Sequence, residues 1–266
     1  MLPLKKDQKG HVLPIRAERT RKVPPLDDLL LFFSAGIAPG EEKFKVILLL
    51  QMGLRCRISE VTAVNLKDVL DDEFRRYRVL IQKKKDNVIV EKEIPESIAV
   101  IVRNWVFKNK EWIYSSDGFL FPHTNSRSKH IPAHNVQSWM CKKRLQLCKL
   151  FPSRSFGTII GYRTYNSINK SAVPKQHVEP RYMWSTHLMK RLAGTLIQFV
   201  EKDPKFTQAM LSHDDLEVTM NHYVDQATLL ENKERKVMNQ IFDVNFYESI
   251  TNTNEIKVPA VFGLKN

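Results

Sequence analysis

The chain has 266 residues, enough for one large or two small domains with a buried core. Hydrophobic residues make up 42% and charged residues 27%, which is a globular composition and excludes disorder as the main state. Lysine and arginine outnumber aspartate and glutamate by 42 to 29, a formal net charge of +13. An excess of this sign predicts a polyanionic partner, either nucleic acid or an anionic membrane.

The sequence argues against three classes of protein: membrane-spanning, secreted and zinc-binding proteins. The longest apolar run, Val46–Leu50, is far shorter than the roughly 18 residues that cross a bilayer, and residues 1–6 lack the apolar core of a signal peptide. The three cysteines, Cys56, Cys141 and Cys148, are odd in number and have no CxxC spacing, which argues against a disulfide framework or a zinc site. We therefore expect a cytoplasmic, nucleoid-associated protein that needs no metal or other cofactor.

The N-terminal residues 1–23 carry seven lysines and arginines against one aspartate and one glutamate, without apolar periodicity. We interpret them as an extended basic arm that ends at Pro24-Pro25. Beyond the arm, apolar side chains recur at helical spacing within residues 44–52, 98–105 and 136–147. These stretches predict three amphipathic helices.

Two β-prone runs lie between the first two helices. Tyr77–Gln82 and Val88–Pro95 flank the charged residues 83–87, a pattern that predicts a β-hairpin. The expected fold class is therefore mainly α with a small antiparallel sheet.

The C-terminal half is less regular. Phe151–Met183 is rich in serine, glycine, proline and basic residues and shows no period, so we expect an irregular surface segment or insertion. Helix returns over Trp184–Val200, and Asp203-Pro204 begin another helix with a cap-plus-proline signal. Asp214-Asp215 precede a third.

Three basic residues lie together on the helix predicted over Trp184–Val200. His187, Lys190 and Arg191 are three and four residues apart and share one side of that helix. Cations at such a place can hold phosphate oxygens while an imidazole moves a proton near neutral pH. The same residues also fit a solvated basic face, and their spacing alone leaves both interpretations open.

Downstream, Met210–Tyr223 places His213 and Tyr223 around one short helix. Here the sequence resembles the tyrosine recombinase (phage integrase) family, whose catalytic domain ends in a Leu-Gly-His…Tyr pattern after an upstream His-x-x-Arg. His187 precedes His213 by 26 residues, a separation common in that family. Gly53–Val69 resembles its Gly-x-Arg-x-Ser-Glu…Leu…Asp box. With the lysine-bearing hairpin, four ordered boxes match between about residues 24 and 224.

The resemblance implies catalytic roles for two residues in the first half of the chain. Arg57, which follows a buried helix, would hold the scissile phosphate, because a planar guanidinium binds two oxygens at once. Lys83, at the end of the first hairpin strand, would protonate the 5′-hydroxyl leaving group. Lys84 or Lys85 would take that role if the register is shifted, and a solvated turn is the structural alternative for all three.

The resemblance also implies roles for the C-terminal boxes. His187 would assist proton transfer, and His213 would hydrogen-bond the phosphate as charge develops. Tyr223 would be the nucleophile of a covalent 3′-phosphotyrosine, activated by the surrounding cations and a nearby base. These cations would stabilise the charge that magnesium stabilises in metal nucleases, so no metal is implied.

Three positions depart from the family's pattern. Lys190 stands where the family usually has a second arginine, so either Lys190 substitutes for it or the next residue, Arg191, takes its place. Two extra residues between Gly53 and Arg57 make Arg55 a rival for the first arginine.

The third departure concerns the nucleophile. Tyr223 lies one residue later than usual after His213, so His222 occupies the usual register. Typical members also carry a helical DNA-clamping domain where this sequence has only the basic arm. These differences leave open a catalytically degenerate DNA-binding protein of the same fold. A type IB topoisomerase, which has similar chemistry, is a weaker alternative.

Positive charge is concentrated in two places. Residues 1–23 have a local charge of +5 and residues 140–192 one of +10, so the rest of the chain is close to neutral. This distribution predicts a DNA-facing surface beside the phosphate site. Its expected contacts are Lys84, Lys85, Lys142, Lys143 and Arg144.

The resulting prediction is a site-specific recombinase. We expect a basic arm over residues 1–23, a catalytic domain over 24–242 and a C-terminal tail over 243–266. The partner would be double-stranded DNA at a specific recombination site, bound by a homotetramer. The segment after Tyr223 would either dock on a neighbouring protomer or complete the chain's own core.

Overall fold

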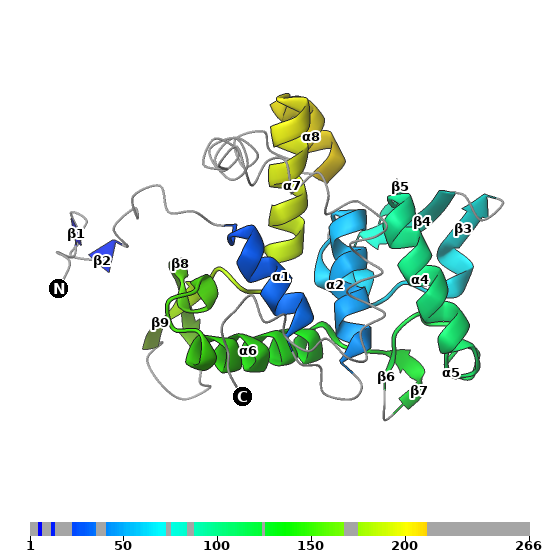
Figure 1. Cartoon of the computed structure of the whole chain (residues 1–266), viewed down its shortest axis with the longest axis horizontal. Coiled ribbons are helices and arrows are strands. Elements are labelled where there is room, and N and C mark those ends of the chain that lie inside the picture. Colours follow the sequence, from blue (N-terminus) through cyan, green and yellow to red (C-terminus); the bar gives the residue numbers. More distant parts are fainter. Residues whose placement is uncertain are drawn as a thin grey trace.

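The computed structural model describes residues 5–6, 12–13, 23–35, 41–72, 76–83, 88–123, 126–167 and 175–211. This part of the chain is mainly helical with small antiparallel sheets, which confirms the predicted fold class. None of its helices combines the length and apolar composition needed to cross a membrane. The α-helices are α1 (Leu26–Ser34), α2 (Glu42–Leu54), α3 (Ile58–Val61), α4 (Glu96–Lys108), α5 (Lys110–Tyr114), α6 (Ala133–Leu150), α7 (Leu188–Glu201) and α8 (Pro204–Leu211) (Figure 1).

Each described sheet is a local antiparallel pairing of neighbouring segments. The largest joins three strands, with β4 in the middle, and the predicted lysine-bearing hairpin is its β4–β5 pair. Short 3-10 turns, η1 (Leu66–Asp68) and η2 (Ser155–Gly157), lead into strands β3 and β8. The strands are β1 (Lys5–Lys6), β2 (Val12–Leu13), β3 (Val69–Asp72), β4 (Arg76–Lys83), β5 (Val88–Glu93), β6 (Pro122–His123), β7 (Ser126–His130), β8 (Ile159–Ser167) and β9 (Lys175–Tyr182).

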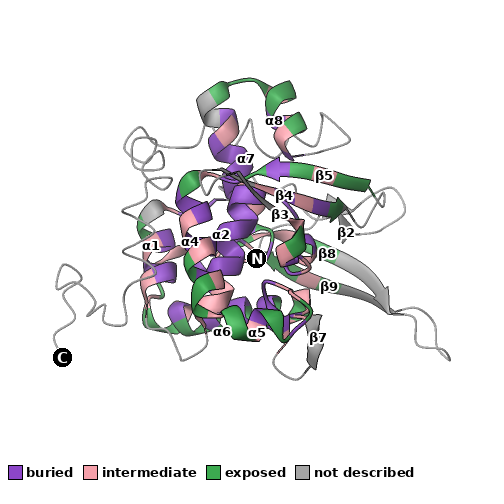
Figure 2. Cartoon of the chain, turned by 90° about the vertical axis from the view of Figure 1, so that its right-hand side faces the viewer, coloured by how far each residue is buried: buried purple, intermediate pink, exposed green. Residues whose placement is uncertain are grey.

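Helix α2 lies at the centre of the core. Every residue from Lys45 to Leu54 is buried, and α2 packs against α4 and α7 (Figure 2). A helix that is apolar on most sides requires partners all around it, so the apolar run Val46–Leu50 is a core segment. The predicted helices within 44–52, 98–105 and 136–147 are confirmed as α2, α4 and α6.

An aromatic cluster joins α1 and α6 to the turn before α7. Phe32 of α1 stacks on Trp184 with ring centroids 4.7 Å apart and meets Trp139 of α6 edge-on at 5.8 Å. The Trp184 indole also donates a hydrogen bond to the Ser155 hydroxyl. This packing keeps Trp184 in the turn, so α7 begins at Leu188, four residues later than the sequence predicts.

The prediction of an irregular segment over Phe151–Met183 is wrong. Most of it forms a long hairpin in which β8 pairs with β9 from Ile159–Tyr182 to Ser167–Lys175, beside α6 in Figure 1. The register shifts between Ile159 and Gly161, and Gly161 has φ +150° at this bulge. The alternation of apolar and polar residues that marks a half-buried strand is missing here, because described side chains on both strands, such as Tyr162 and Val178, are exposed.

Candidate active site

Arg57 reaches the surface through a tight turn at the end of α2. Arg55 ends the helix with a left-handed backbone, φ 57°, and Cys56 beyond it is buried. The Arg57 backbone N–H donates to Glu60 Oε2 at 2.7 Å, and its guanidinium lies 3.4 Å from Glu60 Oε1. The Arg57 side chain remains 48% exposed, so its guanidinium is accessible to an anion.

Arg55 does not share this surface. Its guanidinium donates to the Glu93 carbonyl at 3.1 Å and so ties the end of α2 to β5. Burial lowers its pKa below the usual value. Of the two arginines that the sequence left as rivals, Arg57 is the one exposed to solvent.

The start of α7 brings further basic residues to Arg57. His187 is exposed just before the helix, and Lys190 lies half-buried in its first turn. Arg191 instead points back to its own chain, where it donates to the Met183 carbonyl and lies 3.4 Å from the Ser185 hydroxyl. The charge of Arg57 is among the causes that lower the pKa of Lys190.

Burial and, after it, repulsion between basic groups lower the pKa values of Lys190 and His187. Burial, followed by the charges of Arg57 and Lys92, lowers the pKa of Lys190 from 10.5 to about 8. The pKa of His187 is also lowered. The largest cause is desolvation of the ring by nearby protein atoms, and the positive charges of Arg191, Arg181, Lys190 and Arg57 follow. Positive groups held close together before a ligand arrives are suited to stabilise phosphate charge.

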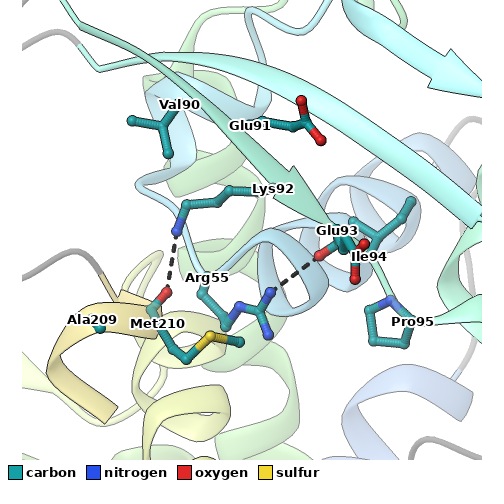
Figure 3. A pocket seen from close by; sticks show the side chains of 9 residues that line it. All are labelled: Arg55, Val90, Glu91, Lys92, Glu93, Ile94, Pro95, Ala209 and Met210. Carbon is teal, nitrogen blue, oxygen red and sulfur yellow. Dashed lines mark hydrogen bonds between the residues drawn. The ribbon is translucent and has the colours of Figure 1, made fainter. Parts of the chain in front are cut away.

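Lys92 belongs to this neighbourhood but was missed in the sequence. It is buried on β5 between exposed Glu91 and Glu93, and its ammonium donates to the Met210 carbonyl near the end of α8 at 3.2 Å (Figure 3). The period of two along β5 places Lys92 on the same face as Val90, which was the available signal. A pocket of about 450 Å³ between β5 and α8 is lined by Lys92, Arg55 and Met210.

The remaining predicted catalytic residues are only partly described. Lys83 is the last residue of β4 and pairs with Val88, which places its backbone at the end of the first hairpin strand as expected. The sequence assignments to Lys84, Lys85, His213, His222 and Tyr223 lie outside the described residues. In the described ranges, no group of three or more His, Cys, Asp or Glu side chains could hold a metal ion.

Two of the predicted DNA contacts on α6 are corrected by the structure. Lys143 and Arg144 are each only 5% exposed. The Lys143 ammonium donates to the Ala35 carbonyl at 3.0 Å and pairs with Glu41 at 3.7 Å, and Arg144 lies 3.7 Å from the centre of the Tyr182 ring. Their charges therefore act inside the protein, whereas Lys142 is exposed.

Solved structures with a similar fold are DNA recombination proteins. The XerH site-specific recombinase bound to difH substrate matches with TM-score 0.52 and 12% identity over 90% of this chain and 60% of that chain. Its complex with palindromic difH substrate matches with TM-score 0.55 and 12% identity, over 90% and 59%. The Tn1549 transposon integrase with circular intermediate DNA matches with TM-score 0.52 and 19% identity, over 84% and 68%.

The chain thus spans about 60% of the length of the XerH chains. A search of curated proteins finds no match. The model of the phage integrase family matches residues 27–229, which is most of the chain. The match covers the turn that carries Arg57, the β4–β5 hairpin and the start of α7. The chain belongs to the phage integrase family, the tyrosine recombinases.

Proposed function

We propose that this chain acts as a site-specific DNA recombinase that cuts and rejoins DNA through a covalent 3′-phosphotyrosine. The observation that carries the proposal is that the backbone before Arg57 and the backbone before His187 meet at the Gln51 side chain, which brings Arg57 near His187 and Lys190 in a chain of this family. A compact positive cluster of this kind matches the charge of a phosphodiester whose oxygens become more negative during cleavage.

Each residue has a defined part in the proposed reaction. Arg57 holds two non-bridging oxygens of the scissile phosphate, and Lys190 adds a point charge in place of a second guanidinium. The Tyr223 phenolate oxygen bonds to phosphorus after its proton passes to a base such as His187. The bond from phosphorus to the 5′-oxygen then breaks, and Lys83 gives that oxygen a proton. His213 hydrogen-bonds the phosphate. Attack by a 5′-hydroxyl reverses these steps and releases Tyr223.

The DNA partner and the assembly belong to the same proposal. The XerH structure contains difH substrate and the Tn1549 integrase structure contains circular intermediate DNA, which supports DNA as the substrate of this chain. Exposed Lys142, together with Lys84 and Lys85, would contact the phosphates. Recombination would take place in a synapse of four protomers on two duplexes, in the nucleoid.

Covalent capture tests this function. Nicked suicide duplexes with randomised sequence around the nick are incubated with the protein, and SDS-resistant adducts are recovered and sequenced. We expect adducts enriched in one sequence, lost completely in Tyr223→Phe and retained in the neighbouring control His222→Gln. An adduct that survives Tyr223→Phe, or its absence on every duplex, contradicts the proposal.

Lys190 favours a second candidate, a catalytically degenerate DNA-binding protein of the same fold. A lysine cannot hold two phosphate oxygens in the forked geometry of a guanidinium. This alternative predicts sequence-specific DNA binding without any adduct. A type IB topoisomerase would form an adduct but relax supercoiled plasmid without sequence preference.

A further inference from the structure

One buried side chain joins the two segments that carry the basic cluster. Gln51 lies near the end of α2 and is completely buried. Its Nε2 donates to the Cys56 carbonyl at 3.2 Å and to the Thr186 carbonyl at 2.8 Å. Each of these carbonyls immediately precedes a residue of the cluster, Arg57 in one case and His187 in the other. A single amide nitrogen therefore connects positions 130 residues apart.

Among the described residues, the Gln51 amide forms hydrogen bonds only through its N–H donors. Both hydrogens of Nε2 have acceptors, while Oε1 is buried and has no hydrogen-bond partner among the described residues. An unpaired buried oxygen is unfavourable, and methionine would fill a similar volume without it. Packing alone does not account for glutamine at this position, whereas a requirement for two donors does.

The turn after α2 is shaped to meet Gln51. The Arg55 N–H donates to the Gln51 carbonyl at 2.8 Å, and its left-handed backbone reverses the chain. This reversal brings the Cys56 carbonyl back onto the Gln51 side chain. Arg55 and Cys56, which lie between the end of α2 and Arg57, are therefore part of the connection.

We propose that Gln51 is a positioning residue that sets the separation between Arg57 and the start of α7. Gln51 contacts no reacting atom. It holds together the backbone segments that precede Arg57 and His187, whose side chains would bind one phosphate from different sides. A misplacement of about 1 Å at such a site lowers the rate by about 100-fold. The inference deepens the proposed function and rests on it for its catalytic consequence.

The placement itself is testable without DNA. An NMR titration of the His187 ring in Gln51→Met should give a higher pKa than in the wild type, moving toward 6.5, because the packing and the Arg57 charge that lower it recede. Asn65→Leu is the matched control, since the buried Asn65 amide also bridges distant segments by donating to the Asp117 carbonyl at 2.7 Å. We expect no shift in the control. An unchanged His187 pKa in folded Gln51→Met overturns the placement.

The catalytic consequence is measured by single-turnover adduct formation. Gln51→Met should react about 10- to 100-fold more slowly at unchanged DNA affinity. In an Arg57→Ala background the same substitution should have little further effect, because the group to be positioned is gone. Equal losses in both backgrounds contradict a positioning role. Absence of an adduct in the wild type rejects the proposed function, while the NMR titration still decides the placement.

Thermal unfolding shows whether each variant is folded at the temperature of the measurements. If Gln51→Met does not fold, Gln51→Asn replaces it in both experiments. Asparagine keeps the amide but is one methylene shorter, so it cannot reach both carbonyls. The expected changes have the same direction and smaller size, and wild-type values in a folded Gln51→Asn overturn the inference.

Discussion

Two groups of basic side chains in this molecule have different surroundings. The site cluster consists of Arg57, His187 and Lys190, and the interior cluster of Lys143 and Arg144 on α6. In the interior cluster, the ammonium and the guanidinium are held by backbone carbonyls and aromatic rings, and Lys143 also faces Glu41. In the site cluster, burial and then the neighbouring positive groups lower the pKa values of His187 and Lys190, and Arg57 forms an ion pair with Glu60.

The difference shows that partners, rather than charge, separate a structural cation from a binding one. Burying a cation costs free energy because the charge loses its water. Hydrogen bonds to carbonyls and contacts with aromatic rings compensate for this cost within the fold. Cations that repel one another are stabilised when an anion enters between them, and the pKa of Lys190 is lowered first by burial and then by the charges of Arg57 and Lys92. The following substitutions test this distinction.

The largest effect is expected at Arg57. Arg57→Ala should slow adduct formation by about 10²- to 10³-fold, because a donor to the developing phosphate charge is lost. Arg57→Lys should lie between alanine and wild type, since it restores charge without the fork. The rate is measured in single turnover on the captured DNA site. A rate within a few-fold of wild type in Arg57→Ala removes this residue from the site.

In the interior cluster, Lys143→Met should change stability instead of DNA binding. Loss of the ammonium leaves the Glu41 carboxylate without its partner, which should lower the free energy of unfolding by about 2–3 kcal/mol. Urea unfolding gives the stability, and fluorescence anisotropy below the unfolding transition gives the DNA affinity. A weaker DNA complex at unchanged stability would place Lys143 in the interface after all.

The pH dependence should identify Lys190. Because its pKa is lowered to about 8, the ammonium is mostly protonated at pH 7 and mostly neutral at pH 9. Its contribution to the second-order cleavage rate should therefore fall by about tenfold between these values. Lys190→Arg should abolish this decrease, because a guanidinium stays protonated. Identical profiles for the two proteins would show that Lys190 carries no essential charge.

The smallest effect is expected for exposed Lys142, next to the buried Lys143. Lys142→Gln should reduce the salt dependence of DNA affinity by about one phosphate contact, a slope change of about 0.9. Stability should stay within about 0.5 kcal/mol of wild type, as for other surface changes. Affinity measured at several salt concentrations gives the slope. An unchanged slope excludes Lys142 from the DNA contacts.

The sequence already indicates part of the difference between the two clusters, namely that positions 143 and 144 lie on the buried face of α6. Val136, Met140 and Leu147 mark the buried face of α6, and their helical spacing includes positions 143 and 144. The high local charge of residues 140–192 favoured a DNA-facing interpretation, yet long basic side chains can lie inward when acceptors are available. Only the structure supplies those acceptors, which are the carbonyl of Ala35 just after α1, a carbonyl of η2 and an aromatic ring of β9.

By itself, the sequence determined the helices around α2, α4 and α6, the β4–β5 hairpin and the ordered boxes of the family, because each depends on neighbours within a few residues. The tertiary structure decided that Arg191 donates to the Met183 carbonyl, that buried Lys92 acts on Lys190, and that Gln51 ties the segments of Arg57 and His187 together. Adjacent helical residues point in different directions, and only the packing of distant segments selects which one faces a partner.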